Sequence, residues 1–506
     1  MDGSAPIQSS SNTDLELDHS APVQNTTGKA KSPEPQNPAE NMLSGFKELH
    51  LGEGQISPDT VTTLTNPVGC AETPSVTEPQ MEFDAQNTPR DPAIDGSRNS
   101  CSSEENGNDE TNEWVFSKIS LDTLPVEVLL LICEYLEASV IINSMSRVCH
   151  AFHDLFVNEV YWRMRLTKRW PKKYPPVDYD GIDWQELCME RERFHRVWSQ
   201  SDEHMEHFTF NSCLFAAVDV VHLMQEGRFL ATGSRDRYLT LLDLTKYDSS
   251  RPETKKEMQL HCINKAHNGW IWCMASLDNC LYTGSWDTKI KVWDLGQDFT
   301  PVTTYKCKSA VLDIHVEQNF LVATGFDKKV YFIDPRQGNI ISTKRWHRQP
   351  VLCIAADDNY IISGSEDKTF CIYDRRAGIV FKRVGVENYP LDISYHSNQL
   401  WFGDKLGGLT LMDTTYGNFE VVQTYDVGHT NKLTGVIHTE GAIFTSSNDK
   451  TVKVLEPSLD PVPITTLDKH DNGVAGIAYQ NGVLASAGCD ICVGIWRPKN
   501  DWGWSA

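Results

Sequence analysis

Histidine–aspartate pairs at a fixed spacing are the residues of this chain whose types could carry out chemistry. Four histidines each precede an aspartate by 20 residues: His267 and Asp287, His347 and Asp367, His429 and Asp449, and His470 and Asp490. An imidazole beside a carboxylate can transfer protons. A catalytic site, however, needs one set of such groups whose side chains face each other. Here they recur along the chain, so we expect structural aspartates, each accepting hydrogen bonds from its own turn and from the histidine.

The aspartates belong to a repeat with a period of about 40 residues, which is typical of repeated supersecondary units. We call the place of the aspartate in each repeat the marked position. Along the chain it holds Asp236, Asp287, Asp327, Asp367, Leu406, Asp449 and Asp490. The copy with Leu406 matches the repeat less well than the others. Four short strands per repeat predict a β-propeller, and seven copies predict seven blades over residues 204–498. The last copy lacks a final strand, which Phe208–Phe210 could supply to close the ring.

The remaining chemical motifs are weak. Cys489 and Cys492 form one CxxC pair, whereas a zinc site would need two, so both thiols are expected in the core. The loop Gly403–Gly408 lacks the strand–helix context of a phosphate cradle. We therefore expect no catalytic residue, no metal, no cofactor and no enzymatic activity in this chain.

The repeats resemble WD repeats, in which a His, a Ser or Thr, an Asp and a Trp of one blade form a hydrogen-bonded chain. Only the second copy carries all four types, as His267, Thr283 or Ser285, Asp287 and Trp293. The resemblance implies structural roles for His267, Asp287, Trp293, Asp327, Asp367, Asp449 and Asp490.

The same resemblance implies a ligand-binding mouth, lined by the residue before each marked position and by the start of each innermost strand. Of these residues, the predicted substrate-binding set is Arg235, Trp270, Trp272, Trp286, Phe326, Lys405 and Lys432. Aromatic anchors beside Arg or Lys are typical of binding hot spots. Because recognition of several phosphates would need clustered arginines, we expect an apolar or mixed peptide as the ligand.

Composition separates the N-terminal residues from the rest of the 506-residue chain. Residues 1–112 lack Trp and Tyr and hold 5 Lys/Arg against 19 Asp/Glu, which predicts a disordered acidic tail. Four residues of this tail precede prolines and are candidate phosphorylation sites: Ser32, Ser57, Thr73 and Thr88. A short C-terminal tail is expected at residues 499–506.

The formal net charge of −23 argues against a general nucleic-acid binder. No apolar run is long enough for a membrane span, and no hydrophobic signal stretch follows Met1, so no membrane association is expected. The 14 scattered cysteines favour free thiols in a reducing compartment, the cytoplasm or the nucleus.

Residues 113–165 are predicted to form a small all-α module, because apolar residues fall on one face of each short helix. Forty-odd helical residues expose more apolar surface than they can bury internally, which implies a partner. Residues 166–203 are predicted to form a helical linker, with a helix from Asp183 to Trp198. A basic run is expected to be a solvated face: Arg163, Arg165, Lys168, Arg169, Lys172 and Lys173.

The helical module resembles an F-box. The matching residues are Leu124, Pro125, Glu127, Leu129, Ile132, Leu136, Val148, Cys149 and Trp162. The pattern departs at His150–Phe152, where many F-boxes place a basic residue and a Trp. Tail, F-box, linker and propeller together resemble the F-box/WD-repeat family.

That resemblance implies a non-catalytic substrate receptor of a Skp–cullin–F-box ubiquitin ligase. Its Skp adaptor would bind Leu124, Pro125, Val128, Ile132 and Leu136, and the propeller would hold a protein substrate. Two alternatives stay open. The chain could be a substrate receptor of another cullin family, whose receptors bind a propeller adaptor through a short sequence box. Two segments partly match that box: Asp334–Arg336 and Asp374–Arg376. The chain could also be a scaffold without a ligase.

Overall fold

The structure is a computed structural model that describes residues 121, 124–177 and 179–499. The predicted acidic tail with its four candidate phosphorylation sites, the first residues of the predicted F-box and residues 500–506 lie outside the described residues.

A helical module of the F-box type follows Leu124. Its helices are α2 (Val126–Glu134), α3 (Ala138–Asn143), the short 3₁₀ helix η2 (Met145–Arg147), α4 (His150–Val157) and α5 (Glu159–Arg169). Pro125 precedes α2, and its carbonyl accepts hydrogen bonds from the amides of Val128 and Leu129 at 3.0 and 3.1 Å. The buried apolar residues of the module are Leu129, Cys133, Ala138, Ile141, Phe152, Phe156, Trp162 and Leu166.

Phe152 fills the core at the point where the sequence departs from the usual F-box pattern. Its ring packs edge-on against Phe156, with the centroids 6.3 Å apart. The indole Nε1 of Trp162 donates a hydrogen bond to the carbonyl of Phe156 at 2.7 Å. Phe152 therefore packs in the module's interior.

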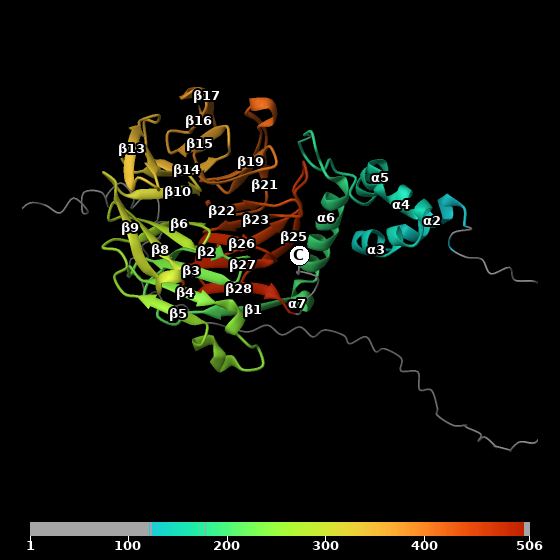
Figure 1. The fold of residues 1–506 in the computed structure, drawn as a ribbon, viewed down its shortest axis with the longest axis horizontal. Coiled ribbons are helices and arrows are strands. Elements are labelled where there is room, and N and C mark those ends of the chain that lie inside the picture. The colour runs from blue at the N-terminus through green and yellow to red at the C-terminus, as the bar shows by residue number, and fades with distance from the viewer. Residues whose placement is uncertain (1–120, 122–123, 178, 500–506) are drawn as a thin grey trace, which may run out of the picture. The chain divides into compact units, whose positions relative to one another are not determined.

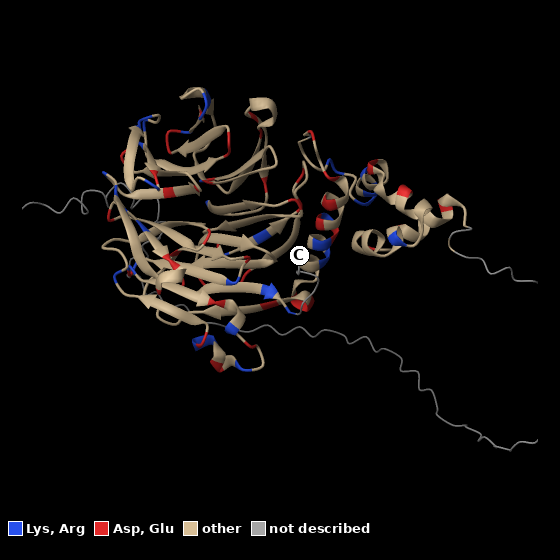
Figure 2. Cartoon of the chain, viewed as in Figure 1, with Lys and Arg blue, Asp and Glu red and all other residues tan. Residues whose placement is uncertain are grey.

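Helix α6 (Trp184–Ser199) joins the module to the propeller, and the short α7 (Ser201–His204) follows it (Figure 1). Asp183 caps α6, because its side chain accepts hydrogen bonds from two amides of the first turn at 3.0 Å. Leu187 and Cys188 pack in the core of the F-box module. Phe194 and Trp198, about two turns further on, pack in a core of the propeller. Both acidic and basic residues lie along this helix (Figure 2).

Seven four-stranded antiparallel sheets form the propeller in the described residues. Blade 1 has β2 (Val218–Met224), β3 (Phe229–Ser234), β4 (Leu239–Asp243) and β5 (Gln259–Ile263); blade 2 has β6 (Ile271–Leu277), β7 (Cys280–Ser285), β8 (Lys289–Asp294) and β9 (Thr300–Lys306). Blade 3 has β10 (Val311–Glu317), β11 (Phe320–Gly325), β12 (Val330–Asp334) and β13 (Asn339–Lys344); blade 4 has β14 (Val351–Ala356), β15 (Tyr360–Ser365), β16 (Thr369–Asp374) and β17 (Ile379–Gly385).

The remaining blades continue the order around the ring. Blade 5 has β18 (Pro390–His396), β19 (Gln399–Asp404), β20 (Gly408–Asp413) and β21 (Glu420–Asp426); blade 6 has β22 (Leu433–His438), β23 (Ile443–Ser447), β24 (Val452–Leu455) and β25 (Pro463–Leu467). Blade 7 has β26 (Val474–Gln480), β27 (Val483–Gly488), β28 (Val493–Pro498) and β1 (Met205–Phe210). Each innermost strand contacts the innermost strand of the next blade, and β26 contacts β2. The predicted seven-bladed propeller is confirmed.

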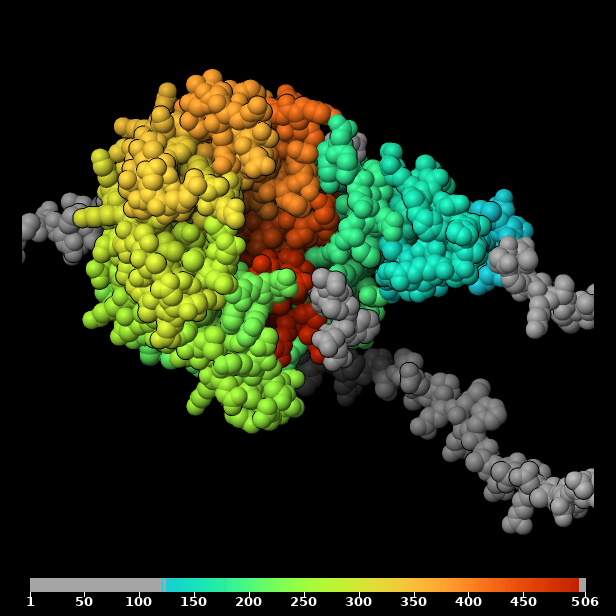
Figure 3. Space-filling view, viewed as in Figure 1, coloured from blue at the N-terminus to red at the C-terminus, as the bar shows by residue number. Residues whose placement is uncertain are grey.

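Strand β1 closes the ring as predicted. It pairs antiparallel with β28, with Phe208 opposite Ile495 and Phe210 opposite Val493. Arg497 Nε and Glu206 Oε2 form an ion pair across the same strands at 2.8 Å. In the space-filling view, the red C-terminal residues lie directly beside the green residues of the first blade (Figure 3). The first and last parts of the propeller therefore share one sheet.

Gly441 in the β22–β23 turn gives a test of how α6 is held. A Cβ atom there would lie 2.2 Å from Cδ2 of Phe194, although the glycine backbone itself is not left-handed. We expect Gly441→Ala to push α6 from the propeller at a cost of about 1–3 kcal/mol. Hydrogen exchange of the α6 amides should accelerate roughly tenfold or more. The control is Gly385→Ala, where an added Cβ meets nothing within 4 Å. Equal exchange in the two variants would contradict this account.

Candidate functional site

Blade 2 contains the four-residue chain of hydrogen bonds that WD repeats suggest. Trp293 Nε1 donates to Thr283 Oγ1 at 2.9 Å, and His267 Nε2 lies 2.8 Å from the same hydroxyl. His267 Nδ1 lies 3.1 Å from Asp287 Oδ2. Ser285 Oγ instead accepts from the amide of Asp287 at 3.1 Å, so Thr283 is the hydroxyl in the chain.

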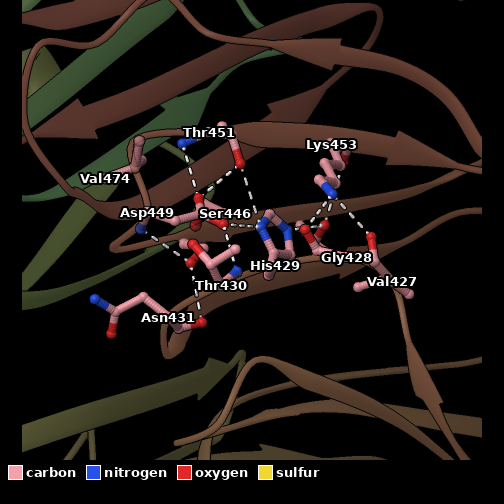
Figure 4. Close-up of polar contacts among 12 residues, drawn as sticks. Val427, Gly428, His429, Thr430, Asn431, Ser446, Asp449, Thr451, Lys453 and Val474 are labelled. Carbon is pink, nitrogen blue, oxygen red and sulfur yellow. Dashed lines mark hydrogen bonds and ion pairs between the residues drawn. The ribbon is translucent and has the colours of Figure 1, made fainter.

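The other histidine-bearing blades repeat this arrangement. In blade 6, His429 Nδ1 lies 2.9 Å from Asp449 Oδ2, and Thr451 Oγ1 donates to Asp449 Oδ1 at 2.7 Å (Figure 4). Burial would raise the pKa of Asp449, but the hydrogen bonds from Thr451, His429 and the backbone outweigh it and lower that pKa to about 2. Burial lowers the pKa of His429 despite the nearby carboxylate. The pair is therefore a neutral imidazole beside a carboxylate at neutral pH, buried within one blade.

Two blades without the histidine keep the turn by other means. In blade 3, Tyr331 donates its hydroxyl to Asp327 Oδ2 at 2.9 Å and accepts from the amide of Lys308 at 3.2 Å. In blade 5, Asp404 accepts from the amides of Leu406 and Gly408, both at 2.8 Å. The sequence reasoning missed both substitutes, although Asp404 stands only two residues before the marked position.

Four of the predicted substrate-binding residues form an aromatic patch, defined as Trp270, Trp272, Trp286 and Phe326. Trp286 is central, because its ring centroid lies 5.9 Å from those of Trp270 and Trp272. The Phe326 ring of blade 3 lies 6.0 Å from Trp286. All four side chains are half-buried, so the patch presents rings at the face of the propeller that carries the aspartate turns.

Arg235 borders the aromatic patch and is held by a residue that sequence reasoning missed. Its guanidinium lies 5.2 Å from the ring centroid of Trp270. Arg235 Nε also donates to both carboxylate oxygens of Asp219, at 3.0 and 3.1 Å. Burial raises the pKa of Asp219 to about 6, against the opposing effect of Arg235. Part of the Arg235 charge is therefore neutralised within the protein.

Lys405 and Lys432 bring positive charge to the same face from blades 5 and 6. Lys405 Nζ lies 5.4 Å from the ring centroid of Tyr389. Burial lowers the pKa of Lys432, and the charges of Arg235 and Lys405 lower it further. The structure thus places the other two predicted cations, Arg235 and Lys405, within electrostatic range of Lys432, while the aromatic rings gather on blades 2 and 3.

The F-box surface shows a mixture of exposed and half-buried side chains at the predicted Skp-binding positions. Pro125 and Val128 are exposed, and Leu124, Ile132 and Leu136 are half-buried. Leu136 packs against the module's own core. Further exposed apolar residues that the sequence reasoning did not select are Val126, Leu131, Tyr135, Val140 and Val148, with Tyr135 reaching 91% exposure. The available signal was the helical periodicity of α2, which places Leu131 on the side opposite Leu129 and Cys133.

One residue of the basic run is buried, which corrects the expectation of a solvated face. Arg165 is 8% exposed, and its Nε forms an ion pair with Glu192 Oε1 of α6 at 2.7 Å. Its guanidinium also donates to the carbonyl of Cys133 at 2.6 Å. Burial would lower the pKa of Arg165, but Glu192 outweighs it and raises that pKa. The helix spacing alone could not show this, because the partner carboxylate lies in another helix.

Glu192 also anchors α3. Its Oε2 accepts a hydrogen bond from the amide of Ala138 at 2.8 Å. Its Oε1 lies 3.0 Å from Arg169 Nη1. On the other side of α6, Arg191 is buried and pairs with Glu456 of the propeller at 3.1 Å. Consecutive residues of α6 thus fasten it to the F-box module and to blade 6.

Within the part of the chain that the structure describes, no cluster of three or more His, Cys, Asp or Glu side chains could hold a metal ion. Over the same residues, no helix is both long enough and apolar enough to cross a membrane.

Comparison with known proteins agrees with this architecture. An F-box-like family model matches residues 121–168, and a model of the WD domain, G-beta repeat, matches residues 259–294 and 338–374. Helical module, shared helix and propeller therefore define an F-box protein with a WD-repeat propeller.

Curated relatives specify the family. The chain is 37% identical to F-box/WD repeat-containing protein 9 of Bos taurus over 376 residues, which cover 74% of this chain and 82% of the relative. It is 36% identical to the Homo sapiens protein of the same name, covering 75% and 83%. It is 26% identical to F-box/WD repeat-containing protein mec-15 of Caenorhabditis elegans, covering 61% and 78%. The chain belongs to the F-box/WD repeat-containing protein family.

Proposed function

We propose that this protein is a substrate receptor of a Skp–cullin–F-box ubiquitin ligase. The observation that carries the proposal is a set of exposed apolar side chains within the F-box match: Val126, Val128 and Leu131 on α2, and Tyr135 directly after it. A helical module of this size rarely leaves such residues in water without a partner. The Skp adaptor is the partner that F-box membership favours.

The propeller would hold the protein target through the aromatic patch and the neighbouring cations. These rings are half-buried and pack against one another, so their side chains are already restricted and lose little further entropy on binding. Helix α6 would then keep the target at a fixed distance from the ligase machinery. The chain would act by proximity, without a catalytic residue of its own.

Val128→Arg should abolish capture of the Skp adaptor. Val128 is 41% exposed, so the substitution leaves the module's core intact while placing a charge in the proposed interface. A buried, unpaired charge should weaken binding about 100-fold or more. The measurement is co-purification of the Skp adaptor with the full chain.

The matched control is Val160→Arg on α5, where the valine is 58% exposed and lies outside the proposed contact. Skp capture should persist in this variant. If Val128→Arg retains the adaptor as well as Val160→Arg does, the proposed contact is wrong.

The partners captured by the unmodified chain distinguish the alternatives. Skp with its cullin supports the proposed receptor. A propeller adaptor with a different cullin would instead favour Arg336 and Arg376, two exposed residues on adjacent blades whose amides bond to Asp334 and Asp374. If neither cullin co-purifies with the chain, the remaining alternative is a scaffold protein without a ligase.

A further inference from the structure

Blade 1 carries an insertion between its third strand and its outer strand. Residues 244–258, which we call the blade 1 insertion, separate β4 from β5, whereas only residues 335–338 separate the corresponding strands β12 and β13 of blade 3. The insertion forms two short 3₁₀ helices, η3 (Leu244–Lys246) and η4 (Pro252–Lys256). Thr254 is buried within it, so the insertion is an ordered part of the fold.

The apolar residues of the blade 1 insertion pack on strand β1, which belongs to blade 7. The ring centroids of Tyr247 and Phe208 lie 4.1 Å apart. Leu244 and Met258 are buried in the same core cluster as Phe208. The insertion of one blade thus contacts the outer strand of the neighbouring blade.

Arg497 of blade 7 stands where five other blades have an aspartate. In those blades the aspartate ends the third strand and accepts a hydrogen bond from the amide two residues later, in the turn to the outer strand. These aspartates are Asp243, Asp294, Asp334, Asp374 and Asp413. In blade 7 the outer strand β1 precedes the other strands in the chain, so a turn does not connect β28 to it. An arginine at this position can instead donate to groups from other parts of the fold.

The guanidinium of Arg497 joins three parts of the chain. Its Nε donates to Glu206 Oε2 of β1 at 2.8 Å. Its Nη1 donates to the carbonyl of Leu244 at 2.6 Å, and its Nη2 donates to the carbonyl of Tyr247 at 2.8 Å. The guanidinium also lies over the rings of Phe208 and Tyr247, 5.4 and 5.1 Å from their centroids. One side chain of β28 therefore binds both β1 and the blade 1 insertion.

We propose that the blade 1 insertion and Arg497 form a clasp that keeps β1 paired in the ring. Among the described strands, β1 pairs with β28 alone, so it could separate without disturbing the other six sheets. Hydrogen bonds made by a charged group are stronger than neutral ones, and Arg497 makes three of them here. These contacts must break before β1 can leave blade 7. The inference does not depend on the proposed ligase role.

Hydrogen exchange of the β1 amides in the full chain tests the proposal. Arg497→Gln removes the charge and its bonds, so exchange of residues 205–210 should accelerate about 30-fold or more. Tyr247→Ala removes the ring of the blade 1 insertion that packs on Phe208, and it should accelerate the same amides about fivefold or more. Exchange of residues 351–374 in blade 4 should stay unchanged in both variants.

Arg375→Gln is the matched control, because the side chains of Arg375 and Arg497 are 21% and 20% exposed. Arg375 makes a comparable set of contacts away from β1, with two hydrogen bonds to Glu317 at 2.9 Å and its guanidinium 4.3 Å from the ring centroid of Phe320. This variant should leave β1 exchange unchanged.

Equal β1 exchange in Arg497→Gln and Arg375→Gln would overturn the proposal, and so would an equal acceleration of blade 4 in Arg497→Gln. Faster β1 exchange in Arg497→Gln without any change in Tyr247→Ala would overturn it as well, because the ion pair with Glu206 would then act without the blade 1 insertion.

Discussion

Glu192→Gln should detach the F-box module from α6. The carboxylate is the countercharge of the buried Arg165 and the acceptor for the first amide of α3. An amide side chain removes the charge and leaves the guanidinium of Arg165 buried without it. Breaking a buried ion pair in this way costs about 3–5 kcal/mol. Hydrogen exchange of residues 124–169 should therefore accelerate by two orders of magnitude or more, since 1.4 kcal/mol is about a factor of ten.

Glu190→Gln on the same helix is the control. Glu190 pairs with Arg193 one turn away at 3.2 Å, and both side chains are partly exposed. Loss of such a pair costs at most about 1 kcal/mol. Protection of the F-box module should be nearly unchanged in this variant. Similar protection in the two variants would show that Glu192 is not what holds the module to α6.

The double substitution Trp286→Ala plus Phe326→Ala should remove most of the protein's targets. Trp286 contacts each other ring of the aromatic patch, so its loss dismantles the proposed binding surface. Truncating buried aromatic anchors typically costs about 2 kcal/mol or more each, and two of them should weaken binding at least 100-fold. The measurement is quantitative mass spectrometry of proteins that co-purify with the chain, while Skp capture serves as a check on folding.

Phe381→Ala plus Tyr416→Ala provides the matched loss of two aromatic rings. Phe381 lies on the outer strand β17 and is 50% exposed, and Tyr416 is also exposed. Neither belongs to the aromatic patch, so the set of captured targets should stay the same. An unchanged target set after loss of Trp286 and Phe326 would mean that targets bind elsewhere on the propeller.

The fold could be predicted because its signals are local and repeated. An aspartate in a tight turn, such as Asp287, accepts a hydrogen bond from the amide two residues later, and this short-range bond recurs in blades 1, 2, 4, 6 and 7. The closing strand followed from counting strands and from the cost of an open sheet edge. Both arguments need only sequence order and spacing.

The partners of buried charges could not be predicted in the same way. Arg165 and Glu192 lie in separate helices, and Asp219 of β2 pairs with Arg235, which follows β3. In blade 3 the hydrogen bond to the aspartate comes from Tyr331 on β12, whereas in other blades it comes from a histidine that precedes the innermost strand. These pairings depend on how separate elements pack in three dimensions, and the spacing of residues along the sequence does not show that packing.

Closure of the ring by β1 has a consequence for biosynthesis. Among the described strands the ribosome makes β1 first, and its partner β28 last. Until β28 is made, the amides and carbonyls of β1 that pair with it have no partner strand. The nascent chain must therefore be shielded from pairing with other strands until β28 emerges. A premature stop before Val493 would leave that edge open permanently and should direct the product to aggregation or degradation.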